Sequence, residues 1–181
     1  RVVVEQRRPV ELDQHYLVSD RTHHRLRFMP MLVEGQPNAD ALRLVASGVR
    51  FGGRGPRVRR EPRGSGERHL ATPARDEVVD VLRERNLLPA IYFIFSRAQC
   101  DEAAQLLLER GGVAGDPARV ERLREIAAER LAGLHAADLD VLDADDFMRR
   151  LEAGIASHHA GLVPPFKEVV EQAFVEGWID V

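Results

Sequence analysis

Two short segments of the chain carry groups that could bind an anion. Ser96 and Arg97 bring a hydroxyl and a guanidinium to the start of a predicted helix, where free backbone N–H groups favour negative charge. The second segment, residues 158–161, has the sequence His-His-Ala-Gly and directly follows a short apolar stretch. Phosphate is the ligand that suits a guanidinium beside a helix start. These two segments are the candidate binding sites of the chain.

Each segment also has a purely structural interpretation. Ser96 with Gln99 three residues later fits a capping box, in which the serine only caps its helix. Neighbouring strand residues point to opposite faces, so His158 and His159 are poorly arranged to bind one metal ion, and we expect one buried and one exposed histidine. Cys100 is the only cysteine, which excludes an internal disulfide and a zinc site built from several cysteines. We predict no metal site.

An alternation of apolar runs and helical patterns must position both segments. Residues 87–95 form a nearly unbroken apolar run, typical of a strand covered on both faces, and a helix follows over 96–110. Residues 155–160 and 178–181 have the pattern of two further strands, joined by a helix that begins at Pro164. This order predicts an α/β fold with a parallel sheet, whose ligands gather at the carboxyl ends of the strands. Both candidate sites lie at such ends.

The remaining elements surround this predicted sheet. A helix is expected over residues 72–86, with Thr72 as its cap, and two more over 118–131 and 144–152, with Asp143 as a cap. The latter two resemble an inserted helical pair. The first 18 residues have the pattern of two extended segments without a partner strand nearby, and a short helix follows at about 39–47.

Charge divides the chain into a basic front and an acidic back. Residues 1–68 hold 14 arginines and 8 acidic residues, whereas residues 101–181 hold 8 basic and 17 acidic residues. Residues 50–68 concentrate five glycines, two prolines and seven arginines, a composition that predicts a disordered basic loop. Such a loop is either a solvated insertion or a segment that binds the phosphates of RNA.

Several function classes lack their motifs. The chain has no GxxxxGK[ST] loop, no GxGxxG, no GxSxG and no HExxH. No apolar run reaches the roughly 20 residues that cross a membrane, and no signal-peptide core is present, so we expect a cytoplasmic protein with no membrane partner. A small-molecule transferase that holds a phosphate at Ser96 is an open alternative, which the missing glycine-rich fingerprint disfavours.

Together the two candidate segments resemble a known family. LPAIYFIFSRAQCDEAAQLL resembles motif IV of the superkiller-like DExH-box RNA helicases of superfamily two, and SHHAGLVPPFKEVVEQAFVEGWIDV resembles the segment just before their motif V. The opening RPVELDQHYLV is similar to the linker between the two motor domains of that family. The arginine bias and the insertion from Arg50 to Arg68 favour the actinobacterial HelY-like branch.

The resemblance implies a partial RecA-like (P-loop NTPase-type) parallel sheet with flanking helices, behind an extended linker and the basic loop. Residues 1–49 would be the interdomain linker and the end of the first motor domain, 50–71 the Arg/Gly-rich loop, and 72–181 the first part of the second motor domain, with a helical insertion at about 113–153. Walker A, DExH, motif V and motif VI are absent from these residues.

It also implies a function for the longer parent protein. The parent would be an ATP-dependent RNA helicase that uses ATP and Mg²⁺ and acts 3′ to 5′ on single-stranded RNA or on duplexes with a 3′ overhang, with RNA-degradation machinery as a partner. This segment alone would bind no cofactor and be inactive, with no catalytic residue. Ser96, Arg97, His159 and Gly161 would contact the nucleic-acid backbone. The alternative is a non-enzymatic RNA-binding module that uses the Arg/Gly loop.

Overall fold

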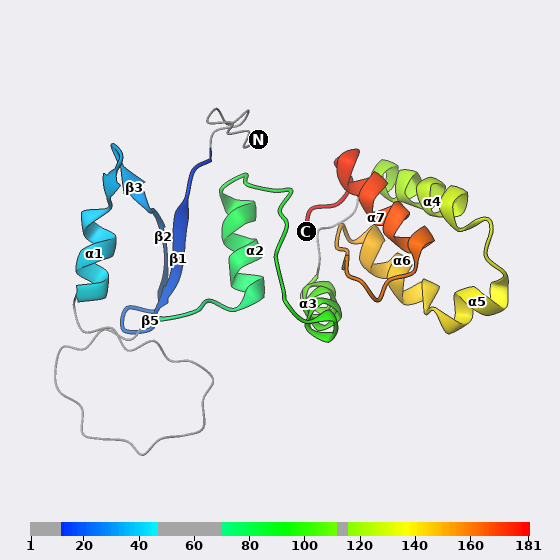
Figure 1. Ribbon diagram of the computed structural model, residues 1–181, viewed down its shortest axis with the longest axis horizontal. Helices are drawn as coiled ribbons and strands as arrows, with labels where there is room; N and C mark the ends of the chain where they lie inside the picture. Colours follow the sequence, from blue (N-terminus) through cyan, green and yellow to red (C-terminus); the bar gives the residue numbers. More distant parts are fainter. Residues whose placement is uncertain (1–11, 47–69, 112–115) are drawn as a thin grey trace, which may run out of the picture. The chain divides into compact units, whose positions relative to one another are not determined.

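The structure, a computed structural model, describes residues 12–46, 70–111 and 116–181 (Figure 1). The predicted basic loop at 50–68 lies outside these ranges. The chain divides into two units, Arg1–Ala74 and Arg75–Val181. Among the described helices, none has the length and apolar character needed to cross a membrane.

The first unit is built on an antiparallel hairpin. Strand β1 (His15–Asp20) pairs along its length with β2 (Arg25–Pro30), and β5 (Leu70–Ala71) pairs with the other edge of β1. The prediction that the opening residues lack a partner strand nearby is therefore wrong. The unit also contains β3 (Leu32–Val33), β4 (Gln36–Pro37) and α1 (Ala39–Ala46). Helix α1 confirms the short helix predicted at about 39–47.

A buried carboxylate anchors the turn of this hairpin. The Asp20 side chain is fully buried and accepts hydrogen bonds from the His23 backbone N–H at 3.2 Å and from Arg27 Nε at 3.2 Å, with His23 Nδ1 at 3.0 Å. Burial raises the pKa of the Asp20 carboxyl, but the hydrogen bonds from His23 and the charges of His23 and Arg27 outweigh it. The pKa of Asp20 therefore lies below its ordinary value.

The lowered pKa predicts that the hairpin loosens in acid. Because the folded pKa lies below the unfolded value of about 3.9, the stabilisation by Asp20 is complete above that pH and is lost as pH falls through the folded pKa. Amide hydrogen exchange of β1 and β2, followed by NMR between neutral pH and roughly pH 2, should show protection falling below about pH 4. In Asp20→Asn this pH dependence should vanish, and protection at neutral pH should fall by roughly 1.5–3 kcal/mol.

Asp40→Asn is the matched control, because Asp40 is exposed and forms only a surface ion pair with Arg43. Equal loss of protection in both variants would contradict a special role for Asp20.

The second unit is mostly helical. Its helices are α2 (Arg75–Glu84), α3 (Arg97–Glu109), α4 (Pro117–Leu131), α5 (Ala136–Val141), α6 (Ala144–Glu152) and α7 (Pro164–Val175). Ser96 caps α3 as predicted, since its hydroxyl accepts the Gln99 N–H. Asp143 precedes α6 in a left-handed conformation and makes no side-chain cap bond, so that predicted cap is wrong. Likewise α2 begins at Arg75, too late for Thr72 to cap it, and α5 was not predicted.

The core of the second unit lies between α4, α6 and α7. Leu123 and Ile126 of α4 are fully buried against Val169 of α7, and the Phe147 ring of α6 meets the Phe166 ring edge-on at 4.6 Å. These residues recur at helical spacing, so each helix presents one apolar stripe to the others. Burying such side chains is the main favourable term that holds the three helices together.

The three predicted parallel strands are not regular strands in the described residues. Their backbones meet only at one end: Ala90 N–H donates to the Asp180 carbonyl, Asp180 N–H to that of Gly154, and Ala156 N–H to that of Val181, at 2.8, 2.8 and 2.9 Å. The described sheets are small and antiparallel, and a RecA-like parallel sheet is not seen. The predicted α/β class is confirmed only in the sense that the described residues combine helices with small antiparallel sheets.

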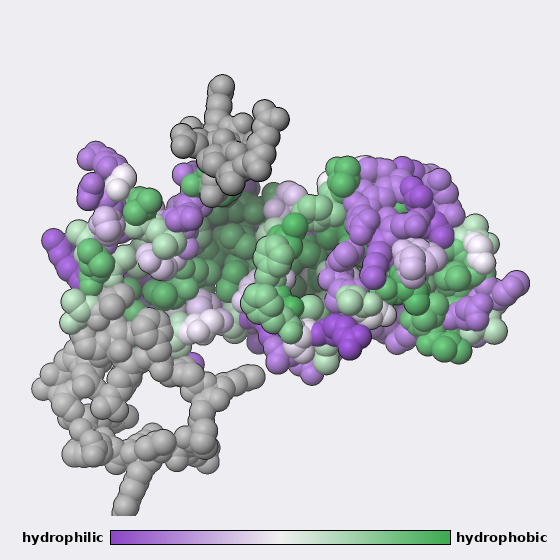
Figure 2. Space-filling view, viewed as in Figure 1, coloured by the Kyte–Doolittle hydropathy of each residue, from purple (hydrophilic) through white to green (hydrophobic). Residues whose placement is uncertain are grey.

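The apolar run at 87–95 is also more exposed than predicted. Phe93 is 78% exposed and Phe95 is fully exposed, so the expectation of a strand covered on both faces is wrong. Hydrophobic surface follows this segment in the space-filling view (Figure 2). The run borders an apolar groove of about 450 Å³, whose other wall includes residues 155–158.

Gly154 is required where these backbones meet. Arg119 Nε donates to the Trp178 carbonyl at 2.6 Å, and its Nη1 donates to the Asp180 carboxylate at 2.9 Å. A Cβ on Gly154 would lie 2.8 Å from Arg119 Nη2 and 2.9 Å from Asp180 Oδ2, and the φ of Gly154 is +75°. Both the space and the backbone conformation therefore demand glycine.

We expect Gly154→Ala to lower the free energy of unfolding by roughly 2 kcal/mol or more, because left-handed strain and a steric clash add. Gly177→Ala isolates the left-handed strain, since Gly177 has φ +78° and an added Cβ there would meet no atom within 4 Å. This variant should lower the free energy of unfolding by about 1 kcal/mol. Gly133→Ala, at an open position, should change stability by less than about 0.5 kcal/mol. Urea unfolding measures all three, and equal effects at Gly154 and Gly177 would refute the clash.

Candidate functional site

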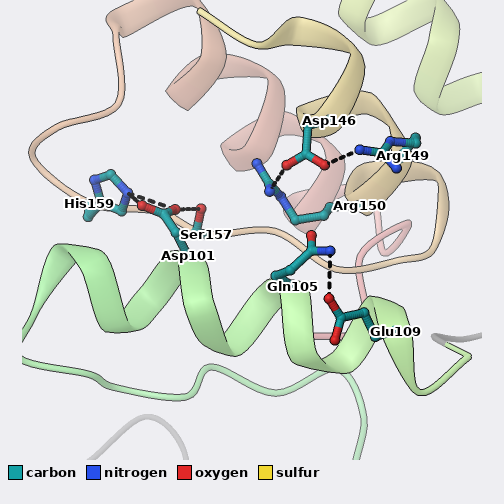
Figure 3. A network of polar contacts seen from close by, with 8 residues as sticks. All are labelled: Asp101, Gln105, Glu109, Asp146, Arg149, Arg150, Ser157 and His159. Carbon is teal, nitrogen blue, oxygen red and sulfur yellow. Dashed lines mark hydrogen bonds and ion pairs between the residues drawn. The ribbon is translucent and has the colours of Figure 1, made fainter.

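Helix α3 is tied to the segment before α7 by one carboxylate. Asp101 Oδ1 accepts a hydrogen bond from Ser157 Oγ at 2.7 Å, and both Asp101 oxygens lie 3.1 Å from His159 Nε2 (Figure 3). Ser157 is buried, and the His159 side chain is 14% exposed. The network therefore joins residues far apart in the sequence in a partly dry environment, where hydrogen bonds are strong.

The hydrogen bonds indicate which nitrogen of the His159 ring donates and which accepts. Gly161 N–H donates to His159 Nδ1 at 3.1 Å, so Nδ1 must be an acceptor. Nε2 then carries the proton that it donates to Asp101. The ring thus bridges α3 and the turn at residues 159–162, and it holds that turn in shape.

Arg97 lies beside this turn. A Cβ on Gly161 would be 3.4 Å from Arg97 Cδ and 3.2 Å from the His159 ring, so the arginine stem and the imidazole both lie close to Gly161. Arg97 is exposed, and no carboxylate of the described ranges lies within ion-pair distance of it. Its positive charge is consequently available to a ligand in solvent.

His158 has a separate environment from its neighbour. Its Nε2 lies 2.8 Å from Glu171 Oε1 of α7, and the two side chains are 46% and 62% exposed. His158 is thus exposed as predicted, whereas His159 is only partly buried, so the predicted contrast between the two histidines is present in weaker form. Within the described residues no group of three His, Cys, Asp or Glu side chains is arranged to hold a metal ion.

Three of the four predicted site residues come together here. Arg97, His159 and Gly161 are neighbours, while the Ser96 hydroxyl accepts the Gln99 N–H as the cap of α3. Asp101 and Ser157 were not predicted as part of the site. The signal for Asp101 was its position one helical turn after Arg97, which places both on one face of α3.

Comparison with known proteins finds relatives among helicases. Over 98% of its length the chain is 36% identical to the probable helicase HelY of Mycobacterium leprae and to that of Mycobacterium tuberculosis, and it spans 20% of each. Over 58% of its length it is 34% identical to the antiviral helicase SKI2 of Saccharomyces cerevisiae, of which it spans 8%. No protein-family model matches the chain. The chain thus spans about a fifth of the length of the HelY relatives.

The two histidines should respond differently to truncation. His159→Ala removes the hydrogen bonds of the ring to the Gly161 N–H and to the Asp101 carboxylate, and should lower the free energy of unfolding by roughly 1–2 kcal/mol, since each lost hydrogen bond contributes about 0.5–1.5 kcal/mol. His158→Ala removes only an exposed pair with Glu171, and should cost less than about 1 kcal/mol. Urea unfolding of the two variants measures the difference, and equal losses would contradict the bridging role of His159.

Proposed function

Because this chain belongs to the superkiller-like DExH helicases of superfamily two, we propose that it contacts the backbone of single-stranded nucleic acid within such a helicase. Arg97, the turn at His159 and Gly161, and the helix start at Ser96 would provide the contacts. Guanidinium and backbone N–H groups bind phosphate oxygens of any sequence, so they position a strand without reading it.

The observation that carries this proposal is the uncompensated Arg97 beside the Gly161 turn. Most described arginines of the second unit are committed to carboxylates, for example Arg122 to Glu176 at 3.0 Å and Arg119 to Asp180 at 2.9 Å. Arg97 has no such partner in the described ranges. A guanidinium that is exposed and held near a tight backbone turn is suited to a phosphodiester.

The same proposal includes RNA as the nucleic acid that is bound and a helicase activity for the longer parent protein. The parent would use ATP and Mg²⁺ to move 3′ to 5′ and to unwind RNA, with RNA-degradation machinery as a partner. This chain's own residues do not fit a nucleotide or its metal: the sequence has no GxxxxGK[ST] loop, and its described residues offer no three-ligand group. We propose accordingly that residues 1–49, 50–71 and 72–181 are the linker, the basic loop and the start of the second motor domain.

The proposal predicts weak, salt-dependent binding of single-stranded RNA that requires Arg97. In Arg97→Ala the affinity of the 181-residue chain for a ten-nucleotide oligouridylate should fall roughly three- to tenfold, and the slope of log affinity against log salt should fall by about 0.7, the loss of one phosphate contact. Fluorescence anisotropy across a salt series measures both values.

Arg83→Ala is the matched control, because Arg83 is a helix-surface arginine that is paired with Asp80 at 2.8 Å. It should bind RNA as the unchanged chain does. If Arg97→Ala binds normally and deletion of residues 50–68 abolishes binding, the proposal fails in favour of a binding module that uses the Arg/Gly loop.

A further inference from the structure

Asp101 occupies an unexpected place in the surface that we propose to contact phosphate. It lies on α3 one turn after Arg97, and its side chain is 47% exposed. A carboxylate at this position weakens the attraction of Arg97 for an anion. Its role must therefore come from the hydrogen bonds that it accepts from Ser157 and His159.

We propose that Asp101 is the positioning residue of this surface, an inference that rests on the proposed function. Its Oδ1 accepts the Ser157 hydroxyl at 2.7 Å, and both its oxygens accept from His159 Nε2 at 3.1 Å. These bonds fasten the strand-like segment and the turn to the same helix that carries Arg97. The distance between Arg97 and the turn is thereby determined by α3 itself.

The His159 ring transmits the effect to the backbone of the turn. With its proton held on Nε2 by Asp101, Nδ1 remains free to accept Gly161 N–H at 3.1 Å. A proton on Nδ1 would face that N–H, and the bond would be lost. Gly161 would then move from its place beside the ring and the Arg97 stem, where an added Cβ would lie 3.2 Å from one and 3.4 Å from the other.

The direction in which Asp101→Asn changes the affinity for RNA tests the proposal. Removing a negative charge near Arg97 would strengthen RNA binding if electrostatics alone mattered. If Asp101 positions the turn, affinity for the oligouridylate should instead fall by at least about threefold, because the amide can accept fewer bonds and can donate to Nε2. Glu102→Gln removes the same charge from the next, exposed residue of α3, and should leave affinity unchanged or raise it.

The nitrogen chemical shifts of the His159 ring give a second readout that needs no RNA. We expect a proton on Nε2 in the unchanged chain and in Glu102→Gln, and a mixture of tautomers in Asp101→Asn. Ser157→Ala, which retains the carboxylate and His159, should keep the Nε2 tautomer and lose affinity less than Asp101→Asn. Circular dichroism would reveal whether Asp101→Asn folds. If it does not fold, Ser157→Ala provides the test instead. A changed His159 tautomer or a rise in RNA affinity in Ser157→Ala would then overturn the inference.

The outcomes separate this inference from the proposed function. If Arg97→Ala lowers RNA affinity but Asp101→Asn raises it or leaves the His159 tautomer unchanged, only the positioning role is refuted. If Arg97→Ala has no effect on RNA affinity, the proposed contact surface is refuted, whatever the tautomer shows. Weaker binding in Asp101→Asn together with a changed tautomer supports both.

Discussion

Asp180 is the point at which distant parts of the second unit meet. Its N–H donates to the Gly154 carbonyl, its own carbonyl accepts Ala90 N–H, and its carboxylate accepts Arg119. One residue thus connects the apolar run before α3, the segment before the Gly161 turn, and helix α4. Arg119 and Asp180 are both largely buried, so neither can lose its partner without leaving a charge in a poor solvent. The absence of a side chain at Gly154 is a direct consequence of this crowding.

The geometry of the site follows from this meeting point. Residues 155–158 leave it on one side, and the chain turns at Gly161 before α7 begins at Pro164. Helix α7 is held by its apolar contact with α4, the same helix that carries Arg119. The turn is therefore fixed at both of its ends, and Asp101 ties its first residue, His159, to α3. Each of these constraints is needed for an arginine on one helix to meet a backbone turn from another segment.

Local physics explains which features could be predicted. Helices α3, α4, α6 and α7 were predictable because their apolar stripes, and in α3 the Ser96 cap, are recognised within a few residues of sequence. The apolar run at 87–95 predicted a covered strand, but both burial and strand formation depend on partners that a sequence window does not contain. Strand β2 was missed because its arginines hide the alternation of a strand, and its pairing relies on Asp20. Asp101 was missed because its partners lie more than 50 positions away.

Charge acts differently in the second unit from what its composition suggests. The unit is acidic, and its arginines mostly form ion pairs inside the unit; hydrogen bonds from Arg122, then Gln172 and Trp178, lower the pKa of Glu176 to about 2. Attraction by net charge therefore cannot bring a nucleic acid to this unit, because the long-range field has the wrong sign. Under the proposed function, a phosphate is instead recognised at short range by a guanidinium whose position relative to nearby N–H groups is fixed. In such a site, the residues that hold Arg97 and the turn in register determine affinity as much as Arg97 does.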